Sequence, residues 1–338
     1  MLNKIPKWNL TLFVLIVLEI IIFGMINPRF WNVTILLNSF NDFLAIAIIG
    51  FFVTIVVITG GIDISGVSII GLTSVVTGLL SQVAGLNIWV SILCAILTGG
   101  LCGLLNGVLI AYGRVQAMVI TLGGMLLYSG IAIVLVGVSN VSTYEGISGF
   151  SEGFSQIANG ELLGLPNAVI IFIIMFFIAY ILLHRTRFGR YVYLTGINQN
   201  TAKYAGIDTK RIITAAYVLS GLSAGIAGVI LTSYLGSARS DYGAEYLMPI
   251  LTVVVLGGTF ITGGKGGVVG TALASILLGF MQVGLQMAGV ATQYIGLATG
   301  VLLIVSVAFL GINPDFRFNV KRIITQKQNM GGKRRWEN

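Results

Sequence analysis

Long apolar runs recur along the whole chain, and they constrain its fold more than any other feature. Each run has about 17 residues or more, enough for a helix to cross a bilayer core of about 30 Å. A helix also satisfies its own backbone hydrogen bonds in lipid. The runs predict an all-α, polytopic membrane protein with about ten spanning helices, at residues 10–26, 43–59, 66–84, 88–112, 117–138, 168–184, 212–234, 246–262, 267–288 and 292–312.

The scarcity of charge supports this interpretation. Charged residues make up 9% of the 338 residues, whereas soluble domains have roughly 25%. No stretch is left over for a soluble domain, so residues 1–338 are predicted to form a single transmembrane domain. Glycine-rich stretches within the spans put small residues three or four positions apart, which favours close helix packing.

The distribution of basic residues predicts the orientation. Of the 19 lysines and arginines, 17 lie on one side of the predicted spans, and only Arg29 and Arg239 lie on the other. The positive-inside rule therefore places both termini in the cytoplasm. The net charge of +8 is concentrated in loops beside the membrane, so we expect attraction to anionic membrane lipids and no nucleic-acid partner.

Three connections are long enough to have roles of their own. The outer loop 139–167 has no basic residue but carries Glu145, Glu152 and Glu161, so it forms an acidic external surface. The inner loop 185–211 mixes basic, polar and small residues with apolar positions at helical spacing, which predicts short helical turns lying against a partner. A short outer turn at 236–247 carries both charge signs.

The stretch ITGGIDISGVSIIG, at 58–71, interrupts an apolar segment with polar residues. Gly60 and Gly61 weaken a helix, and a charged Asp63 costs about 2.5 to 3.5 kcal/mol at the centre of a spanning helix. A helix break that faces protein or water is therefore predicted. Two roles stay open: a turn in which Asp63 or Ser65 caps the next helix, and a direct part in a transport pathway.

Four further polar residues lie within predicted spans. Glu19 is either a functional acid or a structural, paired or protonated one. Asn106, Gln282 and Gln286 either bond between helices or offer hydrogen bonds to a polar solute. The two glutamines are four residues apart and share a helix face.

Other motifs are rejected. The segment TFITGGKGG, at 259–267, resembles a phosphate-binding loop but has Thr259 and Gly266 where the motif requires glycine and a hydroxyl residue. His184 is the only histidine, so catalytic and metal sites have no support. Three classes remain, an intramembrane enzyme, an ion-coupled carrier and the membrane subunit of an ATP-driven transporter, and the polar inner loop favours the last.

Three ordered motifs then carry a resemblance. The segments GRYVYLTGINQNTAKYAGI (189–207), GGIDIS (60–65) and VVVLGGTFITGGKGGVVGT (253–271) resemble the sugar-type ABC importer permeases, the ribose, xylose and galactoside group, along nearly the entire chain. The resemblance implies a type II importer permease fold in the bacterial inner membrane. It also implies a second homologous permease subunit, two ABC ATPase domains that bind the ATP in place of this chain, and a periplasmic substrate-binding protein.

The resemblance also implies roles for residues. Those expected to contact the ATPase, in the coupling loop 185–211, are Gly189, Arg190, Gly196, Asn198, Ala202, Gly206 and Ile207. Those expected at the binding protein are Glu145, Glu152, Arg239 and Asp241. The candidate pathway and helix-break residues are Gly60, Gly61, Asp63, Ser65, Asn106, Gln282 and Gln286.

The chain departs from the family pattern at one place. After GGIDIS the family continues with one residue and then Gly-Ser, whereas here Gly66 comes one position early. A shift of one residue rotates a helix position by about 100°, so the role of Ser68 is left open. The ligand implied by the resemblance is a small, neutral, multiply hydroxylated, furanose-like molecule.

Overall fold

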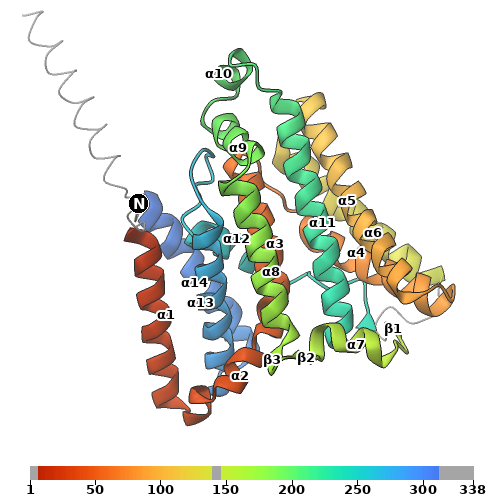
Figure 1. Cartoon of the computed structure of the whole chain (residues 1–338), viewed down its shortest axis with the longest axis vertical. Helices are drawn as coiled ribbons and strands as arrows, with labels where there is room; N and C mark the ends of the chain where they lie inside the picture. Colours follow the sequence, from red (N-terminus) through yellow and green to blue (C-terminus); the bar gives the residue numbers. More distant parts are fainter. Residues whose placement is uncertain (1–6, 139–145, 312–338) are drawn as a thin grey trace, which may run out of the picture.

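The computed structural model describes residues 7–138 and 146–311, and it is almost entirely helical. Most of the long helices run roughly along one axis (Figure 1). In chain order they are α1 (Lys7–Ile26), η1 (Pro28–Trp31), α2 (Val33–Asn38), α3 (Phe40–Ile58), α4 (Gly66–Gly78), η2 (Leu79–Val83), α5 (Ile88–Gly113), α6 (Ala117–Val138), α7 (Glu152–Asn159), α8 (Asn167–His184), α9 (Arg187–Ile197), α10 (Gln199–Tyr204), α11 (Thr209–Leu235), α12 (Leu247–Leu256), α13 (Val268–Met287) and α14 (Thr292–Gly311).

The prediction of a polytopic helical membrane protein is confirmed. Within the described residues, eight helices are long and apolar enough to span a membrane: α1, α3, α4 continued by η2, α5, α6, α8, α11 and α13. α14 coincides with the tenth predicted span, although its described apolar part, Gln293–Ser306, is shorter than the others. The predicted span 246–262 is too long, because α12 stops at Leu256, before Gly257 and the left-handed Gly258 (φ +86°).

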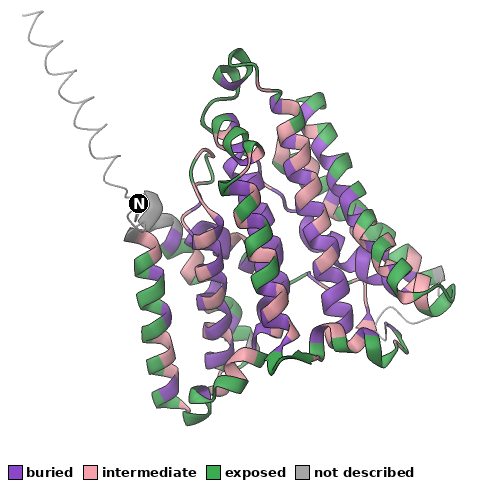
Figure 2. Cartoon of the chain, in the orientation of Figure 1, coloured by how far each residue is buried: buried purple, intermediate pink, exposed green. Residues whose placement is uncertain are grey.

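The core of the bundle surrounds α3. Nine tenths of this helix is buried (89%), whereas less than a third of α1, α5, α6 and α8 is buried. Figure 2 shows the same contrast, with buried residues gathered along the central helices and exposed ones on the outer helices. Because exposed apolar side chains of the outer helices are stable in lipid, this pattern fits a membrane-embedded bundle.

Glycines allow α5 and α11 to lie in direct backbone contact. A Cβ atom added at Gly103 would collide with the carbonyl oxygen of Tyr217, and one added at Gly99 would collide with that of Gly221. Such contacts maximise dispersion attraction and leave no room for larger residues. The prediction of close packing from the glycine-rich stretches is therefore confirmed at this helix pair.

The two ends of the bundle differ. The start of α1 lies at the same end as α9 and α10, here called the α9 end, while α7 and the short strands lie at the opposite, α7 end (Figure 1). β1 (Ile147–Ser148) pairs antiparallel with β4 (Ser237–Ala238), with Ile147 opposite Ala238. β2 (Glu161–Leu162) pairs with β3 (Leu165–Pro166). The first pairing joins two loops at the α7 end that are about 90 residues apart in sequence.

The loop 236–246 enters the bundle instead of crossing its surface. A Cβ atom at Gly71 of α4 would collide with the carbonyl oxygen of Ser240, and one at Gly243 would lie 2.5 Å from the carbonyl oxygen of Val67. Val67 and Gly71 are four residues apart on α4, so the loop follows this helix for about one turn. α12 therefore starts close to α4, part-way along the bundle, and it has only ten residues.

Candidate functional site

The break after α3 forms as predicted. Gly60 adopts a left-handed conformation (φ +86°), and the amide of Gly61 donates to the carbonyl oxygen of Val56, which ends the helix. The chain then turns back into the bundle. A Cβ atom at Gly66, the first residue of α4, would lie 3.6 Å from Ile49 in the middle of α3. The break therefore carries residues 62–65 from the α9 end to the middle of the bundle.

Asp63 lies at the inner end of this break and is 4% exposed. One carboxylate oxygen accepts hydrogen bonds from the Ser65 amide (3.0 Å) and the Ser65 hydroxyl (2.7 Å), and the other accepts one from the Ser220 hydroxyl of α11 (2.7 Å). Asp63 therefore holds Ser65, the residue that precedes α4, and the Ser65 side chain makes no capping bond of its own. Of the two residues considered for the turn, Asp63 accepts the hydrogen bonds and Ser65 donates them.

Asn106 of α5 extends this cluster to two further helices, α5 and α6. Its amide nitrogen donates to the Ser65 hydroxyl (2.8 Å), and its amide oxygen accepts from the Tyr128 hydroxyl of α6 (2.9 Å). The Tyr128 hydroxyl also lies 3.0 Å from the Cys102 carbonyl oxygen. We call Asp63, Ser65, Asn106, Tyr128 and Ser220 the Asp63 cluster.

Neither ion pair among the described residues includes Asp63. Hydroxyl and amide groups surround its carboxylate, and all the other members of the cluster are 0–2% exposed. A buried acid is tolerated when hydrogen bonds satisfy its oxygens. The cluster thus joins the start of α4 to three spanning helices through polar bonds that have no competition from water.

Sequence reasoning found three members of the cluster and missed Ser220 and Tyr128. Ser220 lies in a small-residue stretch typical of helix packing, and Tyr128 is one of 12 tyrosines. Neither residue carries a local signal. Only the contact of α4 with α6 and α11 brings them to Asp63.

A cavity of about 570 Å³ opens at the α9 end beside the break. Gly60 and Gly61 line it together with Tyr217, whose hydroxyl donates to the carbonyl oxygen of Ile62 (3.2 Å). Asp63 does not line this cavity. Its basic lining residues are Arg114, Lys203 and Lys210. The predicted pathway residues of the break therefore lie in two places. Gly60 and Gly61 line the cavity, whereas Asp63 is buried and does not line it.

A second cavity, of about 660 Å³, contains both predicted glutamines. Gln282 and Gln286 face it from α13, and Asp42, Glu245 and Gln293 contribute further polar groups. Apolar lining comes from residues such as Ile46 and Pro249. The glutamines therefore do not meet the Asp63 cluster, and the predicted set of pathway residues occupies two separate places.

The coupling loop forms two short helices, as its spacing predicts. Gly189 and Gly196 allow α9 to lie against the ends of α8 and α3, because a Cβ atom at either would collide with the carbonyl oxygen of Leu183 or Ile58. Asn198 caps α10 by accepting from the amides of Asn200 and Thr201. Of the predicted ATPase contacts, Arg190, Asn198 and Gly206 are exposed, Gly196 and Ile207 are half-buried, and Gly189 and Ala202 are buried.

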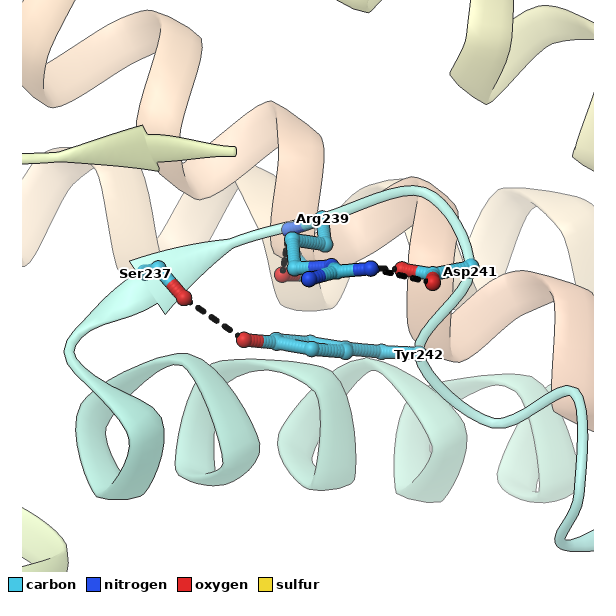
Figure 3. Close-up of polar contacts among 5 residues, drawn as sticks. Ser237, Arg239, Asp241 and Tyr242 are labelled. Carbon is cyan, nitrogen blue, oxygen red and sulfur yellow. Dashed lines mark hydrogen bonds and ion pairs between the residues drawn. The ribbon is translucent and has the colours of Figure 1, made fainter. Parts of the chain in front are cut away.

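The charged residues of the outer turn pair with each other. The Arg239 guanidinium binds both carboxylate oxygens of Asp241, at 2.9 and 2.6 Å (Figure 3). This contact lowers the pKa of the Asp241 carboxyl and raises that of Arg239. Glu152 is exposed in the first turn of α7, and Glu145 lies outside the described residues. Docking of a binding protein at these residues stays a prediction.

Two other polar residues take no part in the cluster. Glu19 is half-buried, and its Oε2 atom forms no hydrogen bond with the described residues. His184 stacks on Tyr180 at the end of α8. In the described part of the chain, no three acidic, cysteine or histidine side chains gather in a metal-binding arrangement.

Known proteins similar to the chain share almost its whole length. Residues 35–307 match the family described as branched-chain amino acid transport system / permease component. The Autoinducer 2 import system permease proteins LsrD of Escherichia coli (strain K12) and Shigella flexneri are each 46% identical over 322 residues, covering 95% of this chain and 97% of theirs. No solved structure matches the chain.

These similarities cover the break, the coupling helices and both cavities. The family is described by one substrate class and the two relatives are named for another, but all are permease components. The resemblance found in the sequence motifs is thereby confirmed. This chain is a multi-pass transport subunit, and it belongs to the permease-component family of ABC transport systems.

Proposed function

We propose that the chain is one of two permease subunits of an ABC importer that moves autoinducer 2, a small furanose-like signalling molecule, across the inner membrane. The similarity along 95% of the chain to permeases named for autoinducer 2 import carries this proposal. The alternative within the family is ribose or another monosaccharide. The alternative outside the ATP-driven class is an ion-coupled carrier.

The geometry fits transport between two cavities. The cavity with Gln282 and Gln286 offers amide and carboxylate groups, which bond well to the hydroxyls of a neutral solute. The cavity at the α9 end touches the break at Gly60. The Asp63 cluster holds together the helices that lie beside this break. A change in that packing would open one cavity to the other by rigid-body helix movement.

The remaining subunits follow from the proposed class. A second homologous permease would complete the membrane part, and two ATPase domains, which bind the ATP, would dock on α9 and α10. A periplasmic binding protein would deliver the ligand at the α7 end. The basic residues at the α9 end, including Arg190 and Lys203, favour a cytoplasmic location for that end and for both termini.

The test is uptake into proteoliposomes that contain this chain, its partner permease, the ATPase and the binding protein. Labelled autoinducer 2 and labelled ribose are supplied separately, with and without ATP. We expect ATP-dependent uptake of autoinducer 2 and none of ribose. ATP-dependent uptake of ribose alone would show that the ligand is a sugar and would keep the ATP-driven class. Uptake by this chain alone under an ion gradient would contradict the ATP-driven class.

A further inference from the structure

The connection between α12 and α13, residues 257–267 and here called the glycine loop, lies between α9 and the end of α3. The amide of Gly264 donates to the carbonyl oxygen of Ile58, the last residue of α3 (2.8 Å). The Tyr193 hydroxyl of α9 donates to the carbonyl oxygen of Gly266 (2.7 Å). The segment that resembles a phosphate loop is thus tied to the helix break on one side and to α9 on the other.

On both sides, the glycine loop lies against its neighbours with backbone close to backbone. A Cβ atom at Gly263 would lie 2.9 Å from Gly60 Cα, and one at Gly264 would lie 3.2 Å from Ile197 Cα. A Cβ atom at Gly196 would lie 2.6 Å from the Gly264 amide nitrogen. Backbone atoms in van der Waals contact have no rotamers through which to yield, so a displacement of one segment displaces the next.

α9 presents two different faces. Val192 and Thr195 are buried, and burial raises the pKa of the inward Tyr193 to about 12. Arg190, Tyr191 and Leu194 are exposed on the other face. One face of the helix is therefore free for a soluble partner, while the other rests on the glycine loop.

We propose that α9, the glycine loop and the break at Gly60 move as one unit. A push on the exposed face of α9 is then passed through Tyr193 and Gly264 to the end of α3, and from there to the Asp63 cluster. Tyr193 is a positioning residue in this scheme. The inference rests on the proposed function, because it assumes that an ATPase acts on α9.

The first test removes only the Tyr193 hydroxyl. Uptake and ATP hydrolysis are measured in the same proteoliposomes for Tyr193→Phe, with Tyr294→Phe, at an exposed position of α14 away from α9, as the matched control. Loss of this partly buried hydrogen bond, at about 1 kcal/mol, predicts about fivefold less solute imported per ATP hydrolysed in Tyr193→Phe. ATP hydrolysis and subunit assembly are expected to persist, and the control is expected to keep the wild-type ratio.

The same ratio in Tyr193→Phe as in the wild type would overturn the inference. So would a parallel fall of uptake and hydrolysis, because that outcome indicates a structural role. If the wild-type complex imports neither ligand, the proposed function is contradicted. The movement of α9 with the glycine loop is then tested by the second experiment alone.

The second test needs no solute. Spin labels are placed at Tyr191→Cys on α9 and Ile261→Cys in the glycine loop, both exposed positions, with Cys94 and Cys102 replaced by alanine. Their separation is expected to stay constant between the nucleotide-free and ATP-bound complex. The separation of Ile261→Cys from Tyr112→Cys, at the end of α5, is expected to change. A change in the first separation, or none in either, would overturn the inference.

Discussion

The Asp63 carboxylate, in the break before α4, accepts a 2.7 Å hydrogen bond from the Ser220 hydroxyl in the middle of α11. The two residues are 157 positions apart in the chain. This bond fixes the start of a short helix against a long one that crosses the bundle. Because both groups are buried, neither can exchange its partner for water without the helices separating.

Replacement of Asp63 by alanine is therefore expected to destabilise the bundle. The change leaves the Ser220 hydroxyl buried without this acceptor and removes the bonds that hold Ser65 before α4, a loss of about 1–3 kcal/mol. We expect a lower unfolding temperature in detergent and lower uptake. Glu161→Ala, which removes an exposed acid of β2, is the control. An Asp63→Ala protein that assembles and transports normally would remove Asp63 from the mechanism.

The contact between α5 and α11 predicts that glycine-to-alanine changes have different effects on stability at different positions. Gly103→Ala puts a methyl group into the carbonyl oxygen of Tyr217, whereas the same change at Gly123 of α6 meets nothing within 4 Å. Overpacking of this kind costs about 1–3 kcal/mol, while alanine in an open helical position is favourable by up to about 1 kcal/mol. Thermal unfolding of the two variants in detergent is expected to shift in opposite directions. Equal shifts would contradict the backbone contact.

Gln286 is expected to act in uptake and to contribute little to folding. It is exposed and lines the 660 Å³ cavity, so Gln286→Leu removes hydrogen bonds to a solute while the described packing is kept. One lost bond of about 1 kcal/mol corresponds to about a fivefold higher KM. The control is Gln116→Leu, at an exposed position before α6. An unchanged KM would exclude Gln286 from solute contact.

The Arg239–Asp241 pair predicts that its contribution to stability depends on pH only under acidic conditions. Arg239 lowers the pKa of the Asp241 carboxyl below its ordinary value of 3.8. The contribution of the pair to stability is therefore present in full above that value and disappears as the pH falls through the lowered pKa. The unfolding temperatures of wild type and Asp241→Asn are expected to differ by a constant amount between pH 5 and 8. A difference that varies across this range would require another titrating group.

The lengths of apolar runs and the positions of glycines were sufficient to predict much of this fold. The spans are recognisable because lipid imposes a minimum length on a helix, and the break at Gly60 is recognisable because glycine pairs and an acid are costly inside a span. The bounds of α12 could not be predicted in this way. The run 246–262 contains uncharged residues only, and the tertiary contacts show that the helix is confined to Leu247–Leu256.

The candidate site was harder to predict than the fold. Asp63, Ser65 and Asn106 stand out in an apolar sequence, and they do meet. Ser220 does not stand out, because serine is common in helix interfaces. Gln282 has the same polar character as Asn106, but it faces a cavity, whereas Asn106 is buried in the Asp63 cluster. Which polar residues share a site depends on helix adjacency, and spacing along one helix carries no information about that.

The loop 236–246 lies along α4 with backbone touching backbone at Gly71 and Gly243. An epitope tag or fluorescent protein inserted there would have to displace part of the bundle interior, although the loop has the glycines, serines and charges of an ordinary surface connection. The turn at Leu163, which is 96% exposed between β2 and β3, is the better place for a label. Attached there, a reporter could follow this subunit through insertion and assembly without altering it.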